Sequence, residues 1–113
     1  MTKRYVNKAH VMWVHEQPCV FQAKNDPCEG PIQAHHLLKP WDGERGMGLK
    51  ANDRNVLPLC QRHHMMLHDR FGDELEFFYS IANDPEFGKD QASHFWFSSP
   101  HYQEDGELRR PPF

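Results

Sequence analysis

Potential metal ligands constrain this chain more than any other feature of its sequence. Nine histidines and three cysteines occur in 113 residues, and four of these side chains fall within nine consecutive positions, at Cys60, His63, His64 and His68. A chain this short buries only about two-thirds of its surface on folding, so a bound metal ion would add useful stability. Because three is an odd number, a disulfide framework would leave one thiol unpaired, and metal ligation accounts for the cysteines better.

The composition predicts a single small globular domain. Apolar residues make up 38% of the chain and charged residues 26%, which is typical of a folded protein rather than a disordered one. No apolar run approaches the roughly 20 residues that a membrane-spanning helix needs, and no signal-peptide pattern opens the chain. We therefore expect a cytoplasmic protein without membrane contact, with one domain over residues 1–102 and a polar tail over residues 103–113.

Periodicity, capping residues and prolines predict an α+β fold. A short helix follows the cap Asn7 and ends before Pro18, and Pro58 places the second strand at a sheet edge or Pro58 itself at a strand end. Two further helices are expected toward the C-terminus, the first opened by Asp73. The predicted elements after the first helix are a strand over 32–38, a strand over 55–59, a helix over 61–70, and helices over 73–82 and 89–97.

Two helix histidines and a histidine pair on the preceding strand predict one metal centre. His64 and His68 are four residues apart, so on a helix their imidazoles lie on one face. The pair His35–His36 is the obvious source of a third ligand. Because successive strand residues point to opposite sides, we expect only one of the pair to bind the ion. Its neighbour would then be free for proton transfer beside the metal.

The cysteines predict a second, closed metal centre. Cys60 and His63 have the C-x2-H spacing of structural zinc knuckles, and Cys19 and Cys28 could complete a tetrahedral zinc site. The eight residues between Cys19 and Cys28 are more than the usual two to four. Buried free thiols, or a disulfide that leaves Cys60 free, are the alternatives to zinc.

The order of these residues resembles the HNH endonucleases, which share the ββα-metal (His-Me finger) fold. The spacing Asn55-x8-His64-x3-His68 is similar to the form found in colicin-type DNases. The stretch from Gly46 to Phe78 also resembles phage and prophage HNH proteins of the RecA-dependent nuclease type, in which a GMG segment precedes PLC-x2-HH and a GxE segment follows. The resemblance covers residues 19–69 together with this GxE stretch.

The resemblance implies a role for each of these residues. His35, His64 and His68 would hold the metal, and His36 would be the general base that takes a proton from the attacking water. Asn55 would hold the hairpin loop and orient the base through hydrogen bonds. The implied fold is a ββα-metal core over about 32–70 with a structural zinc site, flanked by an N-terminal helix and one or two C-terminal helices.

The resemblance also implies the activity. A metal-dependent endonuclease would hydrolyse DNA phosphodiester bonds and leave 5′-phosphate and 3′-hydroxyl ends. The catalytic ion is open between Mg²⁺, Mn²⁺, Zn²⁺, Ni²⁺ and Co²⁺, although a set of three imidazoles suits magnesium least. The alternative is a catalytically inactive, zinc-stabilised module that binds DNA or protein.

The charge distribution allows a nucleic-acid partner despite a formal net charge of −3. Residues 35–71 carry six basic and four acidic side chains, a balance of +2, whereas residues 72–107 carry nine acids and one lysine, a balance of −8. Arg45, Lys50, Arg54 and Arg62 flank the predicted centre, and we expect at least two of them to contact phosphates. A recombination or packaging protein is a further partner to consider, since the sequence contains no recognition helix for reading bases.

Overall fold

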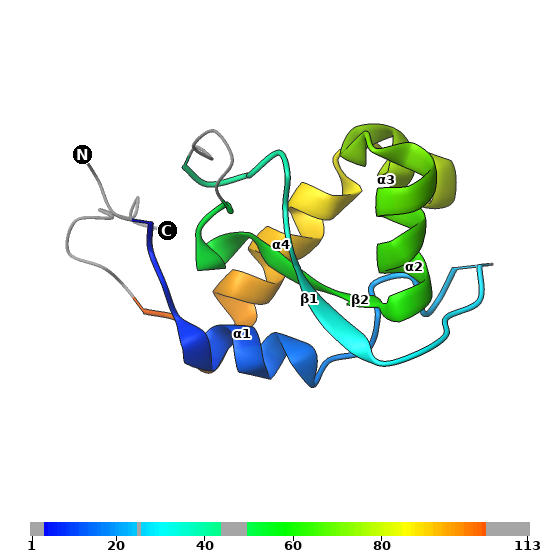
Figure 1. The fold of residues 1–113 in the computed structure, drawn as a ribbon. Coiled ribbons are helices and arrows are strands. Elements are labelled where there is room, and N and C mark those ends of the chain that lie inside the picture. Colours follow the sequence, from blue (N-terminus) through cyan, green and yellow to red (C-terminus); the bar gives the residue numbers. More distant parts are fainter. Residues whose placement is uncertain (1–3, 25, 44–49, 104–113) are drawn as a thin grey trace.

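The structure is a computed structural model that describes residues 4–24, 26–43 and 50–103. Within these residues the fold is α+β, with helices and one small antiparallel sheet. Figure 1 shows the two strands at the centre of the molecule, with helices around them. None of the helices in the described ranges is long and apolar enough to span a bilayer.

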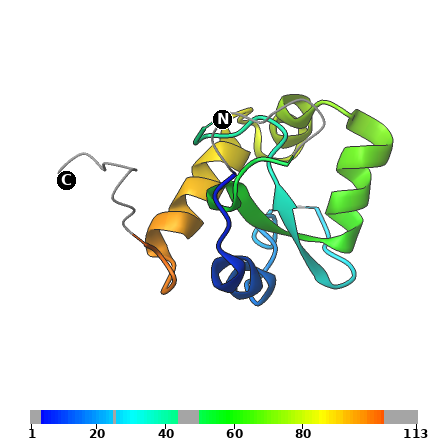
Figure 2. The same ribbon diagram turned by 60° about the vertical axis from the view of Figure 1, so that its left-hand side comes forward.

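The sheet pairs β1 (Ile32–His36) with β2 (Val56–Cys60), so that Ile32 lies opposite Cys60 and His36 opposite Val56. Each strand has only one neighbouring strand in this two-stranded sheet, which is why Pro58 is tolerated there. All five residues of β2 are nevertheless buried, because α1, α2 and α4 all pack against it. Figure 2 shows the strands between α4 on one side and α2 on the other.

Helix α1 (Lys8–His15) begins at its predicted cap. The side-chain oxygen of Asn7 accepts a hydrogen bond from the backbone N–H of His10 at 3.0 Å. Val14 is buried, and the ring of Trp13 meets the ring of Phe95 edge-on. Helix α1 therefore contacts both the sheet and the last helix.

Helix α2 (Gln61–Met66) is shorter than the helix predicted over 61–70. It continues into a π-helical turn, η2 (Leu67–Phe71), in which the N–H of Gly72 donates to the carbonyl of Leu67 at 2.8 Å. Gly72 has a φ of +69°, and this left-handed residue ends the helix. His68 therefore lies in the widened last turn rather than in a regular α-helix.

Helices α3 (Glu74–Ala82) and α4 (Phe87–Ser98) confirm the two predicted C-terminal helices, with small shifts at their ends. Asp73 caps α3 by accepting from the N–H of Leu75 at 3.0 Å. A short 3-10 turn, η1 (Asp53–Asn55), precedes β2. The core combines residues from β2, η2 and α3 with residues from the segments after α1 and β1, including Phe21, Leu37, Leu57, Leu59, Leu67, Phe77 and Phe78.

Replacing Gly88 with alanine should destabilise the fold, although alanine is normally the better helix residue by about 1 kcal/mol. A methyl group at this buried position of α4 would overlap with Cε2 of Phe78, a ring that is itself buried. We expect Gly88→Ala to lower the free energy of unfolding by about 1–3 kcal/mol in urea denaturation. Adding Phe78→Leu should recover part of the loss in Gly88→Ala, and an unchanged midpoint in the single variant would contradict this packing.

Candidate metal centres and functional site

The structure brings three of the predicted histidines together. The ligand atoms of His35, His64 and His68 all lie within 4.8 Å of one another, and the Nε2 atoms of His64 and His68 are 3.3 Å apart. His35 comes from β1, while the other two come from α2 and η2. His35 is buried and His68 is exposed. The cluster of three imidazoles therefore extends from the buried strand β1 to the surface.

Hydrogen bonds to the outer ring nitrogens leave the inner nitrogens available as ligands. The Nε2 atom of His35 is 2.7 Å from a carboxylate oxygen of buried Glu74, so Nε2 carries the hydrogen and Nδ1 keeps its lone pair. In the same way, Nδ1 of His64 bonds to Oε1 of Gln33 and leaves Nε2 free. A metal-bound histidine usually has such a partner on its second nitrogen. Three imidazoles, of which His35 and His64 have this arrangement, suit a Zn²⁺-, Ni²⁺-, Co²⁺- or Mn²⁺-type ion.

The pKa of His64 is consistent with a neutral ring. Burial, together with repulsion from His35 and His68, lowers this pKa from its ordinary value to about 4. The ring therefore stays unprotonated over the range in which an ordinary histidine gains a proton. Protons do not compete with a metal for this nitrogen near neutral pH.

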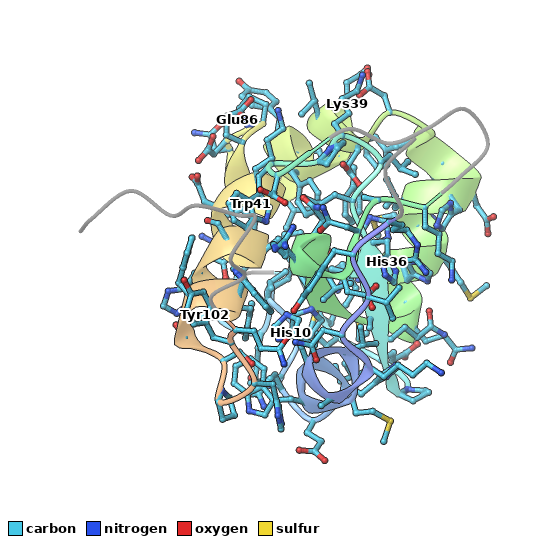
Figure 3. All side chains as sticks on the ribbon, turned by 90° about the vertical axis from the view of Figure 1, so that its left-hand side faces the viewer. His10, His36, Lys39, Trp41, Glu86 and Tyr102 are labelled. Atoms are coloured by element: carbon cyan, nitrogen blue, oxygen red, sulfur yellow. The ribbon has the colours of Figure 1, made fainter. Side chains whose placement is uncertain are left out.

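His36 does not join the cluster. It follows His35 on β1, so its ring points to the other side of the strand, and its Nε2 lies 2.7 Å from Oδ1 of Asp53. Figure 3 shows His36 beside the segment that leads into α1. The expectation that only one of the two neighbouring histidines reaches the other ligands agrees with this geometry.

Asn55 clamps the segment between the strands. Its side-chain oxygen accepts from the N–H groups of Trp41 at 2.8 Å and Asp42 at 3.2 Å, and its amide nitrogen donates to the carbonyl of Asp42 at 3.0 Å. Asn55 is fully buried. Among the residues that the structure describes, however, the hydrogen-bond partner of the His36 ring is Asp53, while the Asn55 side chain bonds to Trp41, Asp42 and Asn52.

The three cysteines and His63 form the second cluster. The Nδ1 atom of His63 lies 3.1 Å from Sγ of Cys60, 3.6 Å from Sγ of Cys19 and 3.8 Å from Sγ of Cys28. All three cysteines are free thiols, so the disulfide alternative does not hold in this structure. The four ligand atoms lie within 4.8 Å of one another, a set that could bind a metal such as zinc.

Burial and hydrogen bonds act on the ionisation of the thiols in this cluster. Burial and the neighbouring thiol of Cys19 raise the pKa of Cys28 to about 12, because negative charge is unfavourable there without a counter-charge. Burial also opposes ionisation of Cys60, but backbone N–H groups of His63 and Glu29 donate to its sulfur and lower its pKa overall. A divalent ion would supply the missing positive charge.

Asp26 is the outer partner of His63. Its Oδ2 lies 2.6 Å from Nε2 of His63 and also accepts from Arg62 at 2.9 Å. The hydrogen bond from Arg62, helped by that from His63, holds the pKa of Asp26 below its usual value. His63 therefore presents the lone pair of Nδ1 to the three sulfur atoms.

The predicted phosphate-binding residues have different environments. Lys50 is exposed, and Arg62 is partly exposed beside the cysteine cluster. Arg54 instead is buried, pairs with Asp42 at 2.9 Å and stacks on Tyr5 at 3.9 Å. The expectation of an accessible phosphate contact at Arg54 is therefore not met in this conformation, and Arg45 lies outside the described residues.

The sequence reasoning missed the acceptor partners of the rings, which are Gln33, Asp53, Glu74 and Asp26. Each is distant in sequence from the histidine that it bonds, and polar residues of these types are common on any surface. The one available signal was Glu74, which follows Gly72 in the GxE stretch of the resemblance. Its contact with His35 across 39 positions could not be read from spacing.

The fold and the two clusters define a small α+β domain with two candidate metal centres, both of which include residues of α2. The chain belongs to the family described as "Protein of unknown function (DUF968)", which matches residues 1–79. It is 38% identical over 88 residues to "Uncharacterized protein YdfU" of Escherichia coli (strain K12), covering 72% of this chain and 23% of that protein. The chain thus spans less than a quarter of this relative. No solved structure matches it.

Removing metal from the cysteine cluster should unfold the protein. We expect one zinc per chain to remain after dialysis against a weak chelator, and Cys60→Ala to lose it, because four ligands that close around an ion contribute directly to folding. The melting temperature of Cys60→Ala should fall by at least about 10 °C, since 1 kcal/mol corresponds to about 4–8 °C in a domain of this size. Equal melting temperatures of the metal-loaded and metal-free wild type would contradict a structural ion.

Glu74→Gln should weaken the histidine centre and leave the cysteine centre unchanged. An amide oxygen is a weaker acceptor for His35 than the carboxylate oxygen. The amide N–H₂ group would also face the backbone N–H groups of Leu38 and Lys39, which in the wild type donate hydrogen bonds to Glu74. We expect the affinity of the zinc-loaded protein for Ni²⁺ to fall about 10- to 100-fold by calorimetric titration. The matched control is Glu76→Gln, the same change at an exposed position of α3. Equal affinities of the two variants would exclude this role.

Proposed function

We propose that this chain is a metal-dependent endonuclease of the HNH type, which hydrolyses phosphodiester bonds in DNA. One observation carries the proposal. Three imidazoles from β1, α2 and η2 converge within ligand distance of one another, while the neighbouring imidazole of His36 is left on the other side of the strand. Such a centre keeps open positions for a substrate, whereas the cluster of three cysteines and one histidine would be closed.

The order of elements supports the proposal. The antiparallel pair β1 and β2 is followed directly by α2, as a ββα-metal core over about 32–70 requires. The family match to residues 1–79 covers every proposed ligand and His36. We propose that this core, its structural zinc site and the flanking helices form a single nuclease domain over residues 1–102.

In the proposed reaction His36 is the general base. Its side chain is 15% exposed, so that a water molecule can reach the ring. His36 takes a proton from water, the water oxygen bonds to phosphorus, and the bond from phosphorus to the 3′ oxygen breaks. The 3′ oxygen then gains a proton from solvent, which leaves 5′-phosphate and 3′-hydroxyl ends. A divalent ion held by His35, His64 and His68 would supply Lewis-acid stabilisation of the developing charge.

The proposed substrate is DNA, with phosphates contacted by exposed Lys50 and by Arg62. Neither side chain reads base edges, so we propose that any specificity comes from DNA shape or from a protein partner such as a recombination or packaging protein. The setting that fits the resemblance is the cytoplasm of a bacterial host, with a phage or prophage as the source of the gene.

Plasmid nicking tests the proposed function. The zinc-loaded wild type should nick supercoiled plasmid when one of Mg²⁺, Mn²⁺, Zn²⁺, Ni²⁺ or Co²⁺ is added. His36→Ala should nick at least about 100-fold more slowly, because a general base contributes about 10²- to 10⁴-fold to the rate. DNA ligase should reseal the nicks, since it requires a 5′-phosphate beside a 3′-hydroxyl.

The matched control is His94→Ala, which removes an exposed histidine of α4 and should nick at the wild-type rate. Equal rates for His36→Ala and wild type would refute the assigned base. If the wild type binds DNA but cleaves it with none of the five ions, the chain is the zinc-stabilised binding module instead.

A further inference from the structure

A buried carboxylate lies against the proposed base. Asp53, in η1, is 4% exposed, and its Oδ1 lies 2.7 Å from Nε2 of His36. The same oxygen accepts from the guanidinium of Arg4 at 3.0 Å, and Oδ2 accepts from the backbone N–H of Asn7 at 2.8 Å. Both carboxylate oxygens therefore have donors, and the position of the group is fixed from two sides.

The carboxylate of Asp53 is held in its ionised form. Burial on its own would raise the pKa of Asp53, but the hydrogen bonds from His36 and Asn7 and the charge of Arg4 outweigh burial and lower it. An ionised carboxylate accepts hydrogen bonds and cannot donate them. The hydrogen between the two side chains therefore belongs to Nε2 of His36, so that in the neutral form of the ring the lone pair is on Nδ1.

We propose that Asp53 is a positioning residue for His36, fixing both the direction of the ring and the tautomer in which Nδ1 can accept a proton. The proposal rests on the proposed nuclease function, in which His36 takes a proton from water. When the ring gains that proton it becomes a cation with Nε2–H still bonded to Asp53, and the nearby negative charge stabilises it. Asp53 itself stays ionised throughout.

The contacts of Asp53 also connect the base to the N-terminal segment. Arg4 and Asn7 precede α1, and the N–H of Asp53 donates in turn to the carbonyl of Tyr5 at 3.1 Å. A purely structural role of Asp53 would be to hold this segment in place. The two roles differ in what they predict for His36, because only the positioning role controls the ring tautomer.

The tautomer of His36 can be measured in the wild type by a method that does not depend on nuclease activity. In long-range ¹H–¹⁵N NMR spectra of the zinc-loaded protein at about pH 8, where an ordinary histidine is neutral, His36 should show a protonated Nε2 and an unprotonated Nδ1. Asp53→Asn should mix the two tautomers. Arg4→Ala loosens the N-terminal segment but keeps the Asp53–His36 hydrogen bond, so it should retain the wild-type tautomer. A wild-type ring protonated on Nδ1 would overturn the proposal, whether or not the protein is a nuclease.

Nicking rates give the second readout. Asp53→Asn should nick about 100-fold more slowly than wild type, within the range of about 10²- to 10⁴-fold that a general base supplies. The matched control Asp90→Asn, at an exposed position of α4, should nick at the wild-type rate. A folded Asp53→Asn variant that nicks like wild type would overturn the positioning role and leave the proposed function intact. Absence of nicking in the wild type itself would refute the proposed function, and the catalytic meaning of Asp53 with it.

Discussion

The alternation of side chains along β1 is the constraint on which the rest of the site depends. Pairing with β2 holds His35 and His36 in an extended conformation, so their rings project from opposite faces of the same short strand. One face meets α2 and η2, and the other meets η1 and the segment before α1. Two adjacent and identical residues thereby acquire different surroundings, and a shift of one residue in the register would exchange them.

Carboxylates outside the two clusters decide which ring nitrogen of three histidines carries the hydrogen. Glu74 accepts from His35, Asp26 from His63 and Asp53 from His36, each at 2.6 to 2.7 Å. A neutral imidazole has one donor and one acceptor nitrogen, so an acceptor on one side directs the lone pair to the other. These three carboxylates thus orient histidine rings through hydrogen bonds.

The two clusters share one helix. Cys60 and His63 stand at the start of α2, while His64 and His68 follow within the next turns. The sulfur of Cys60 also caps the helix by accepting from the N–H of His63 at 3.5 Å. An ion among the cysteines would therefore fix the start of the helix that presents two of the three imidazoles, which couples the stability of one centre to the geometry of the other.

The sequence by itself determined most of the helices and strands and the members of the two clusters of candidate ligands. Fixed local spacings carry that information, since His64 and His68 lie four residues apart on a helix and Cys60 and His63 lie three apart at its start. Only the tertiary structure decided which groups complete the sites. Asp53 and Glu74 reach their histidines across 17 and 39 positions, Arg54 is buried against Asp42 rather than exposed, and the last turn of the helix widens before Gly72. These outcomes depend on chain segments packing together, and no local spacing encodes that packing.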